Sequence, residues 1–523
     1  MPDILIVGAG PTGLTLACEL AVRGVPFQLI DAAEGPFSGS RAKGVQPRSL
    51  EVFDRLGIAG EIVNAGSGDL PYRQYTDDGG FRDIPRAVPE KRPDVPYPVS
   101  ILIPQWRTEA ALRNRLASLG ARVSYGTTLV DAQADANGVR ATIERNGDTG
   151  QIEAAWLVGC DGGRSTVRRV AGLNFLGETR EDMRMLVGDL HVEGVDRQHW
   201  HIWRPAAGGF LAMAPLPGTD AFQLQIAIGP KGPDSPTLEV FQQMVERDTG
   251  RTDIRLSAPT WTSLWRANVR LVDRYRAGRI LVAGDAAHVH TPAGGQGMNT
   301  GIQDAFNLGW KLAAVQSGAD STLLDTYEAE RLPVARHVLG LSTRLADTVA
   351  SSKTEGLVAR NENTSQLDIH YRESPLSREM RTAPGSVRAG DRAPDAPGLL
   401  NGQHSTTLRL FDIFRGPHAT LLAFGEGWKP ILDAALAAAG DTVHAIVVQP
   451  AGFSPSLSLN ETGTNTSDIP TFVDTLGHAN TAWEPGARAL FVVRPDGVIG
   501  FATDQLDIDA LIDWLRLSGL IVR

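Results

Sequence analysis

The 523-residue sequence contains only two cysteines, Cys18 and Cys160. Each lies in an apolar segment far from the other, so we expect two buried thiols rather than a disulfide or a redox pair. No stretch approaches the 18 or more apolar residues of a membrane span. The beginning of the chain also lacks the basic region of a signal peptide. These features predict a cytoplasmic protein without a membrane partner.

Basic residues are scarce for a protein that binds nucleic acid. Lys and Arg total 50 against 60 Asp and Glu, a formal net charge of -10 at pH 7, whereas the neutralisation of phosphates needs a basic surface. We therefore expect no nucleic-acid partner. Because 523 residues exceed what one hydrophobic core usually supports, we expect two or three domains.

Sequence motifs for metal or acyl-transfer chemistry are also missing. There is no HExxH, no zinc-type spacing of Cys and His, and no GxSxG. His199 and His201, like His288 and His290, would share one face of a strand. Without a carboxylate or cysteine at matching spacing, we interpret them as packed or surface histidines. The sequence predicts no metal site.

Residues 3–31 have the pattern of a βαβ unit. The apolar run DILIVG is followed by GAGPTG and by a helical pattern, and VPFQLID is a second apolar run that ends in Asp31. In this context GxGxxG indicates dinucleotide binding, although NAD and FAD share the motif. The alternative is a glycine turn in an unrelated α/β unit.

Each residue of this unit has a physical role in the prediction. Gly8 permits the tight turn, Gly10 lets the backbone approach a pyrophosphate, and Gly13 lets the helix pack closely on the strand. Backbone N–H groups at the start of the helix would hold the phosphate charge, and Asp31 would accept a hydrogen bond from a ribose hydroxyl.

Two later segments also place polar residues and glycines after an apolar strand. AAWLVGCDGG contains Asp161 and Gly162, and RILVAGDAAHVHTPAGGQG contains Asp285 and several glycines. The second segment is no P-loop, because the GxxxxGK[ST] spacing is missing. Ligands of open α/β sheets bind at the carboxyl ends of strands. The three segments together therefore predict one long ligand.

The chain resembles the flavin-dependent aromatic hydroxylases of the para-hydroxybenzoate hydroxylase type, and among them the polyketide and phenol hydroxylases. The resemblance rests on GAGPTG with Asp31, on CDG at 160–162, and on GDAAHVHTPAGGQGMNTGIQDAFNLGWKL at 284–312. RAKGVQPRSLEVFDRLG and PQWRTEAAL are similar to intervening segments of the family. The resemblance implies FAD as cofactor, NAD(P)H as co-substrate, O2, and a phenolic or polycyclic aromatic, polyketide-like substrate.

By the same resemblance, the nicotinamide reduces the flavin, O2 adds at C4a, and the hydroperoxide transfers hydroxyl to an electron-rich ring. Asp285 would bind the ribityl chain, residues 295–299 would follow the isoalloxazine edge, and Asp161 and Gly162 would lie beside the FAD and the route of the nicotinamide. The implied cofactor-binding residues are Gly8, Gly10, Pro11, Thr12, Gly13, Asp31, Arg41, Gln105, Asp161, Gly162, Asp285, Pro292, Gly295, Gln296, Gly297, Met298 and Asn299.

Several of these residues also have ordinary structural interpretations. Asp285 could be a helix N-cap, Asp161 could end a strand in a turn, and Arg41 could be a solvated loop arginine. Arg41 and Gln105 would otherwise contact the ribityl or phosphate portion, with Arg107 as a further candidate. The catalytic residues, including any base that deprotonates a phenol, are unknown.

Residues 181–277 contain short alternating or apolar runs separated by Gly, Pro and Asp turns. They predict a mostly β substrate domain inserted between two halves of an FAD-binding domain, residues 1–180 and 278–350. The proline-rich segment 82–100 predicts an extended surface loop near the pocket mouth, with a lid role as a hypothesis. Aromatic and Met residues of the inserted domain either line the pocket or pack in a core: Trp200, Trp203, Phe210, Met213 and Phe222.

Residues 351–400 predict a linker, because small, polar, proline and glycine residues dominate there. Residues 401–523 predict strand, helix, strand, a hairpin around PDG and a final helix, an order that resembles the thioredoxin-like fold. This segment has no cysteine, so thioredoxin chemistry is excluded and a packing or oligomer role is left. We expect a monomer or a homodimer.

The predicted fold class is thus an α/β, Rossmann-like FAD-binding domain with an inserted mostly β domain and a C-terminal thioredoxin-like α/β domain. The predicted function is aromatic hydroxylation. A Baeyer–Villiger monooxygenase or another flavin oxidoreductase on the same scaffold would keep every cofactor motif. A non-catalytic flavoprotein that binds partners through its C-terminal domain is a further alternative.

Overall fold

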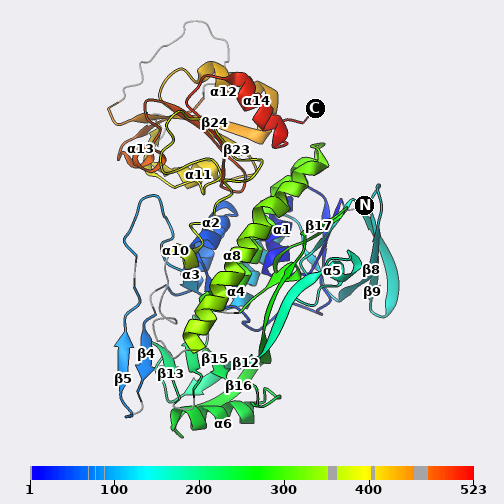
Figure 1. Ribbon diagram of the computed structural model, residues 1–523, viewed down its shortest axis with the longest axis vertical. Helices are drawn as coiled ribbons and strands as arrows, with labels where there is room; N and C mark the ends of the chain where they lie inside the picture. Colours follow the sequence, from blue (N-terminus) through cyan, green and yellow to red (C-terminus); the bar gives the residue numbers. More distant parts are fainter. Residues whose placement is uncertain are drawn as a thin grey trace.

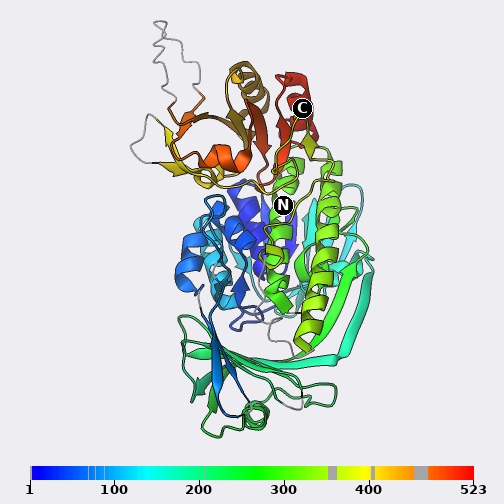
Figure 2. The same ribbon diagram turned by 60° about the vertical axis from the view of Figure 1, so that its left-hand side comes forward.

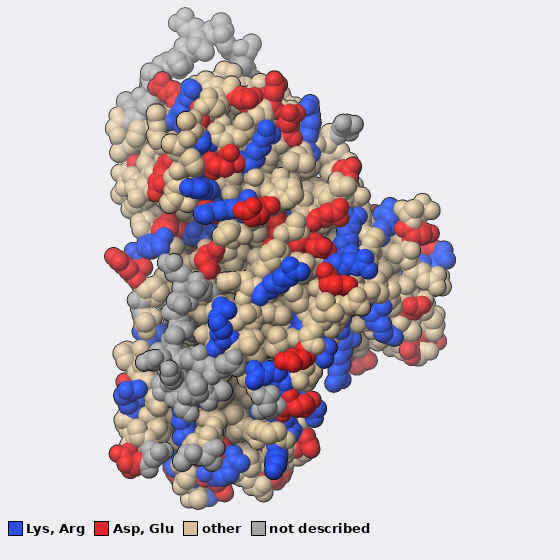
Figure 3. Space-filling view, in the orientation of Figure 1, with Lys and Arg blue, Asp and Glu red and all other residues tan. Residues whose placement is uncertain are grey.

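The computed structural model describes residues 3–68, 70–76, 78–87, 89–205, 208–291, 293–350, 362–401, 407–452 and 469–522. Figure 1 shows three stacked regions: the C-terminal sheet with its helices at the top, a parallel sheet with the long helix α8 in the middle, and a large antiparallel sheet at the bottom. On the face shown in Figure 3, acidic and basic side chains are interspersed. No helix among the described residues is both long enough and apolar enough to cross a membrane.

A six-stranded sheet forms the middle region. Its order is β17-β18-β11-β1-β2-β7, and all neighbours are parallel except β17, which turns back on β18. β1 and β11 are buried along their whole length, which explains their continuous apolar runs. The strands are β1 (Ile4–Val7), β2 (Phe27–Ile30), β7 (Val123–Ser124), β11 (Trp156–Gly159), β17 (Arg276–Ala277) and β18 (Ile280–Val282).

Helix α1 (Pro11–Val22) follows β1 and packs against α7 (Gly297–Gln316) and α4 (Gln105–Ser118). Small residues permit the close approach of α1 and α7, because a Cβ on Gly301 would lie 2.4 Å from Thr12 Oγ1. The remaining helices of this region are α2 (Pro47–Arg55), α3 (Ala59–Ala65), α5 (Thr166–Val170), α8 (Asp325–Ala350) and the 3-10 helices η1 (Gly284–Ala286), η2 (Ala293–Gly295) and η3 (Ser321–Leu324).

The antiparallel sheet has the order β19-β16-β12-β15-β14-β13-β4-β5, with only β13 and β4 parallel. Figure 2 shows β12 and β16 as long curved strands, and α6 (Leu238–Thr249) packs on β16. β16 was not predicted from the sequence. The strands are β4 (Tyr72–Tyr75), β5 (Phe81–Ile84), β12 (Phe175–Glu193), β13 (Trp200–Trp203), β14 (Leu211–Pro215), β15 (Ala221–Ala227), β16 (Arg255–Val272) and β19 (His288–Val289).

This sheet crosses the sequence boundaries expected for the inserted domain. β4 and β5 come from the segment assigned to the FAD-binding domain, and β12 begins at Phe175. The division into domains therefore stays a proposal. The first residues of the proline-rich segment form the edge strand β5, a place that tolerates nearby prolines. Its role as a lid also stays a prediction.

Two smaller sheets complete this part of the chain. One has the order β10-β9-β8 and is antiparallel, and the other pairs β3 with β6. The β3–β6 pair places residues 44–46 beside the loop before α7. Their strands are β3 (Gly44–Val45), β6 (Ile101–Leu102), β8 (Thr127–Ala134), β9 (Val139–Arg145) and β10 (Asp148–Ala154).

The C-terminal sheet contains the predicted succession of strand, helix, strand, hairpin and helix. Its order is β20-β27-β26-β23-β24-β25-β21-β22, with β23 and β24 parallel, β26 antiparallel to β23, and β27 antiparallel to β26. The strands are β20 (Arg378–Glu379), β21 (Pro397–Asn401), β22 (Leu408–Arg409), β23 (Ala419–Phe424), β24 (Val443–Pro450), β25 (Thr471–Asp474), β26 (Ala489–Val493) and β27 (Ile499–Thr503). The helices are α10 (Glu362–Ser365), α11 (Leu410–Phe414), α12 (Lys429–Ala439), η4 (Gly440–Thr442), α13 (His478–Trp483) and α14 (Ile508–Leu517).

Part of the predicted linker belongs to this sheet. β20 pairs with β27 and β21 pairs with β25, although both come from the proline- and glycine-rich stretch. Such short edge strands carry too few residues to show a period in the sequence. The beginning of the predicted linker, residues 351–361, lies outside the described residues.

A buried ionic cluster joins the C-terminal sheet to helices α7 and α8. Arg494 donates to both oxygens of Glu330 at 2.7 and 2.8 Å, and Lys311 donates to the same carboxylate at 2.8 Å. Arg494 also pairs with Asp496 in the predicted PDG turn. These side chains are at most 3% exposed. Burial alone raises the pKa of Glu330, but the two cations outweigh burial and the pKa falls.

Candidate active site

A cavity of about 2190 Å³ extends from the carboxyl ends of β1, β2 and β11 to the face of the antiparallel sheet. Most small-molecule sites occupy roughly 300 to 1,000 Å³. The cavity therefore has room for a dinucleotide and a second large ring system at once. Gly10, Asp161 and Asp285 all line it, so the three predicted strand ends meet at one cavity.

Most of the residues predicted to bind the cofactor line this cavity. Pro292 lies outside the described residues. Gly13 and Asn299 are not among the lining residues, nor is the further candidate Arg107. The predicted residues on the wall are Gly8, Gly10, Pro11, Thr12, Asp31, Arg41, Gln105, Asp161, Gly162, Asp285, Gly295, Gln296, Gly297 and Met298.

The three residues away from the wall have structural contacts. A Cβ on Gly13 would lie 1.9 Å from the Gly8 carbonyl oxygen, so this glycine permits the close helix–strand packing. Asn299 donates to the carbonyls of Gly44 and Gly295 at 2.9 and 2.8 Å. Arg107 donates to the Gly218 carbonyl. Gly13 and Asn299 therefore contact the wall residues Gly8 and Gly295, and Arg107 contacts the turn at Gly218.

The turn between β1 and α1 fits a pyrophosphate. Gly10 has an ordinary φ of -73°, and a Cβ there would meet nothing within 4 Å. The surrounding protein therefore does not require glycine at this position, and the open space belongs to the cavity. No described side chain caps α1, and its first turn has no acidic residue. Its backbone N–H groups are thus available to an anion.

Asp31 and Asp161 orient the backbone beside the cavity. Asp31 accepts from the backbone N–H groups of Ala9 and Ala33 at 2.6 and 2.8 Å, which ties the end of β2 to the glycine turn. Asp161 accepts from the N–H groups at the start of α5, at 2.7 and 3.1 Å. The ordinary interpretation of Asp161 as a turn residue therefore has a structural basis, and its place on the wall is retained.

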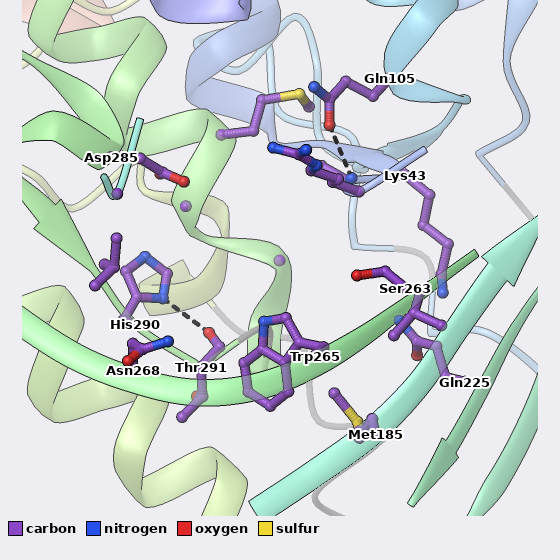
Figure 4. A pocket seen from close by; sticks show the side chains of 18 of the residues that line it. Lys43, Gln105, Met185, Gln225, Ser263, Trp265, Asn268, Asp285, His290 and Thr291 are labelled. Atoms are coloured by element: carbon purple, nitrogen blue, oxygen red, sulfur yellow. Dashed lines mark hydrogen bonds between the residues drawn. The ribbon is translucent and has the colours of Figure 1, made fainter. Parts of the chain in front are cut away.

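Asp285 points into the cavity, with Gln105 on another side of the open space (Figure 4). The Asp285 side chain is exposed, but its exposed surface faces the cavity, which is enclosed by other parts of the chain. Desolvation raises the pKa of Asp285, while His288 and Arg41 act in the opposite direction. The N-cap of η1 is Ala283, so Asp285 does not have the alternative role of a helix cap there.

The loop before α7 requires two of its glycines for backbone reasons. Gly294 and Gly295 have φ values of +77° and +65°, which side chains disfavour. α7 then begins at Gly297 without a side-chain cap and without an acidic residue in its first turn, and Gly297 and Met298 line the cavity. The positive end of a 20-residue helix therefore faces the cavity, where it would stabilise negative charge.

The opposite wall comes from the antiparallel sheet. Figure 4 shows Met185, Gln225, Ser263, Trp265 and Asn268 on this side, across the open space from Asp285. Sequence analysis missed these residues. Within β16, residues 265–271 alternate apolar and polar side chains, a period-2 signal that could have indicated this strand.

The aromatic and Met residues named in the sequence analysis divide between wall and core. Trp200 and Phe210 line the cavity, whereas Trp203, Met213 and Phe222 pack in the core between the sheet and α6. Whether such a residue lines the cavity or packs in the core depends on the face of the sheet to which it points, as Trp200 and Trp203 of β13 show.

His290 and Cys160 also line the cavity. His290 Nδ1 lies 2.8 Å from the Thr291 carbonyl oxygen, so this nitrogen carries the hydrogen. Burial lowers the pKa of His290 to about 4, and its ring is therefore neutral near pH 7. His201 and His288 are buried and hydrogen-bonded. Among the described residues no group of three or more His, Cys, Asp or Glu could hold a metal ion.

Both cysteines are free. Cys18 is buried as expected, but Cys160 is only partly buried because it directly precedes Asp161 at the cavity edge. The expectation of buried thiols is therefore confirmed for Cys18, whereas Cys160 is partly exposed at the cavity.

Comparison with known proteins agrees with this geometry. Residues 1–342 match the FAD binding domain family. The chain is 40% identical over 515 residues to a flavin-dependent monooxygenase of Mycobacteroides abscessus, covering 96% of this chain and 97% of that protein. It is 40% identical to 6-methylpretetramide 4-monooxygenase of Streptomyces rimosus over 72% of this chain and 71% of that protein.

A solved structure extends the similarity to the whole chain. Aklavinone-11 hydroxylase, in a ternary complex with FAD and aklavinone, superposes with a TM-score of 0.82 at 25% identity and covers 99% of both chains. The predicted fold class and family are thereby confirmed. The uncapped helix ends, the open space at Gly10 and the large cavity fit FAD. The chain belongs to the FAD-binding family of flavin-dependent aromatic monooxygenases.

Proposed function

We propose that this enzyme consumes NAD(P)H and O2 to hydroxylate a polycyclic aromatic substrate that carries phenolic groups. The observation that carries the proposal is the continuity of the cavity, which joins the dinucleotide-type strand ends to the sheet wall. In the balanced reaction, aromatic C–H, O2, NAD(P)H and a proton yield the phenol, water and NAD(P)+. Bound FAD would supply the hydride acceptance and the activation of O2.

The chain's own residues would hold the cofactor in an extended arrangement. The N-terminus of α1 beside Gly10 would bind the pyrophosphate, Asp31 the ribose and Asp285 the ribityl hydroxyls. Residues 295–298 and the N-terminus of α7 would lie along the flavin ring. There the helix dipole would favour the anionic reduced state by about 0.3 to 1 kcal/mol. Asp161 and Gly162 would border the nicotinamide route.

The wall formed by the antiparallel sheet suits a flat molecule with polar substituents. Trp265 and Met185 offer apolar surface, while Gln225, Ser263 and Asn268 offer hydrogen-bonding groups. This combination would orient an aromatic ring system across from the 294–298 loop. The 6-methylpretetramide named for the Streptomyces relative and the aklavinone in the solved complex support a polyketide-like substrate class.

Substrate-dependent NAD(P)H oxidation under labelled oxygen tests the proposal. Purified holoenzyme should carry FAD, and a panel of phenols and aromatic polyketides should accelerate NAD(P)H oxidation with one 18O atom in a new phenol. A lactone or ester product would instead identify Baeyer–Villiger chemistry. Reduction of the substrate without 18O would identify another flavin oxidoreductase, and an inert flavoprotein across the panel would contradict the proposal.

Asp285→Ala tests the cofactor assignment separately. Loss of hydrogen bonds to the ribityl chain should weaken FAD binding by about tenfold, measured by fluorescence titration of the apoenzyme. Full occupancy and unchanged turnover would contradict the role of this residue.

A further inference from the structure

We propose that Gln366 is a positioning residue for the flavin-facing loop 294–298, supplied by the segment that leads into the C-terminal sheet. The inference rests on the proposed function, because that function assigns the loop to the flavin ring. Gln366 lies in the turn directly after α10 and does not line the cavity. It would therefore act through the loop and not on the cofactor itself.

Both ends of the Gln366 amide are hydrogen-bonded to this part of the chain. Its Nε2 donates to Gln296 Oε1 at 2.7 Å and to Thr300 Oγ1 at 3.2 Å. Its Oε1 accepts from Gln303 Nε2 at 2.6 Å. Gln366 is 1% exposed, so these bonds form without competition from bulk water. The three contacts span about the first two turns of α7, from its N-cap Gln296 to Gln303.

Gln296 transmits this contact to the loop backbone. Its Nε2 donates to the Gly294 carbonyl at 2.8 Å and to the Thr364 carbonyl at 3.0 Å. Its Oε1 is the acceptor for Gln366. Since the donor end is used by two carbonyls and the acceptor end by Gln366, the orientation of the Gln296 amide is determined. Gln296 itself lines the cavity.

The loop is held from the opposite side by Gln46. Gln46 Nε2 also donates to the Gly294 carbonyl, at 2.9 Å, and its backbone N–H donates to Asn299 Oδ1 at 2.8 Å. The Gly294 carbonyl is therefore held by Gln46, which directly follows β3, and by Gln296, whose amide Gln366 orients. Because Gly294 and Gly295 lack side chains, these bonds are the means by which the protein restricts the loop.

The backbone of Gln366 supports a specific requirement for its side chain. Its φ of +61° lies in the left-handed region, which glycine usually occupies at the end of a helix. A residue with a side chain is strained there, and such strain persists where the surrounding contacts determine it. Glycine would remove the strain but would also remove all three hydrogen bonds.

The test compares three variants of the full-length holoenzyme. Gln366→Met fills the same space without donor or acceptor, and Gln366→Gly suits the backbone if the Met variant fails to fold. Gln303→Met is the matched control, because it removes one hydrogen bond from Gln366 without touching the loop. FAD affinity, the visible spectrum of the bound flavin and its midpoint potential are measured for each.

We expect both Gln366 variants to weaken FAD binding by about tenfold and to shift the flavin spectrum and potential. Gln303→Met should lower resistance to denaturant while leaving the three flavin properties unchanged. Wild-type flavin properties in both Gln366 variants, or equal changes in the Gln303 control, would overturn the inference. A wild-type enzyme that binds no FAD would overturn the proposed function itself, which is a distinguishable result.

Discussion

The chain contains two strand–turn–helix units with similar sequences and different outcomes. β1 leads through Gly8-Ala9-Gly10 to a helix with proline in its first turn, and β23 leads through Gly425-Glu426-Gly427 to another such helix, α12. After Gly10 the space is open and lines the cavity. The turn at Gly427 does not line the cavity, and the side chain of Trp428 packs in the core with α12, 1% exposed, and donates to the Phe424 carbonyl at 2.9 Å.

The comparison shows that a parallel strand followed by a glycine turn is not by itself a ligand site. In the first unit the helix N-terminus borders the cavity, whereas in the second it does not, and the tryptophan that precedes the helix packs in the core. The C-terminal sheet has no cysteine, which excludes thioredoxin chemistry, and it contacts the rest of the chain. Those contacts include the buried ionic cluster, the Gln366 segment, and the ion pairs of Arg392 with Glu51 and of Arg409 with Asp54.

The largest expected effect comes from breaking the buried ionic cluster that joins the C-terminal sheet to helices α7 and α8. Arg494→Met removes one of the two cations that pair with Glu330 and leaves Lys311 as the other. It also removes the guanidinium that pairs with Asp496. Breaking a buried pair costs about 3 to 5 kcal/mol, so the free energy of unfolding in urea should fall by that amount. Arg516→Met removes an exposed ion pair and is the control, with a change of about 0 to 1 kcal/mol. Equal effects would show that the cluster does not join the regions.

Truncation of Trp428, the buried tryptophan of the second strand–turn–helix unit, has the next largest expected effect. Trp428→Ala should lower the free energy of unfolding by about 3 to 5 kcal/mol, because a large buried ring is lost. Leu506→Ala, which truncates a 46%-exposed neighbour of Gly427, should change it by about 0.5 kcal/mol or less. If the Trp428 variant gained nucleotide binding, a strand, glycine turn and helix would suffice for a ligand site. That result would contradict the view that the surrounding cavity defines the site at Gly10.

Two glycines of the first unit should separate binding from folding. Gly10→Ala adds a Cβ into open space, so the apoenzyme should keep its melting temperature while FAD binding weakens by at least about tenfold. Gly13→Ala adds a Cβ 1.9 Å from a carbonyl oxygen and should destabilise the apoenzyme by about 1 to 3 kcal/mol. If Gly10→Ala unfolds the apoenzyme, the open space has been misassigned.

The smallest effect concerns acid sensitivity of the C-terminal region. His418 stacks on His444 with ring centroids 3.5 Å apart. Burial lowers the pKa of His418 to about 4, and His444, Arg55 and Arg23 add to the shift. The folded state therefore favours the neutral ring, and this stability is present above about pH 6.5 and lost as the pH falls toward 4.

His418→Phe keeps a stacked ring that cannot titrate. Urea unfolding of both proteins across this pH window should show about 1 to 2 kcal/mol less acid destabilisation in the variant, a figure reduced for partial solvent access. Parallel curves for the two proteins would exclude His418 as the acid-sensitive group.

The sequence predicted the cofactor end of the site much better than the substrate end. Gly10, Asp31 and Asp285 occur in local motifs whose spacing reflects backbone geometry, so neighbouring residues suffice to recognise them. Ser263 and Trp265 reach the cavity only because β16 pairs with β12, about eighty residues earlier in the sequence. The sequence signal of β16 is a weak alternation within a strand interrupted by polar residues.

Single residues illustrate the same limit. The packing role of Gly13 followed from the GxGxxG motif, whereas the role of Asn299 depends on its contacts with Gly44 and Gly295, which no spacing rule supplies. Gln366 lies within the predicted linker, residues 351–400, where composition suggested no structure. Its importance depends on contacts with α7, sixty to seventy residues away.

By itself, the amino-acid sequence determined the βαβ unit, the three strand ends with their glycines and acids, and the absence of thioredoxin cysteines, because each is a local property of neighbouring residues. Only the tertiary structure decided that these ends share one cavity, which side chains form its second wall, and which segment restrains the loop before α7. The physical reason is that pairing between distant strands and buried amide contacts depends on three-dimensional packing, which leaves no fixed spacing along the chain.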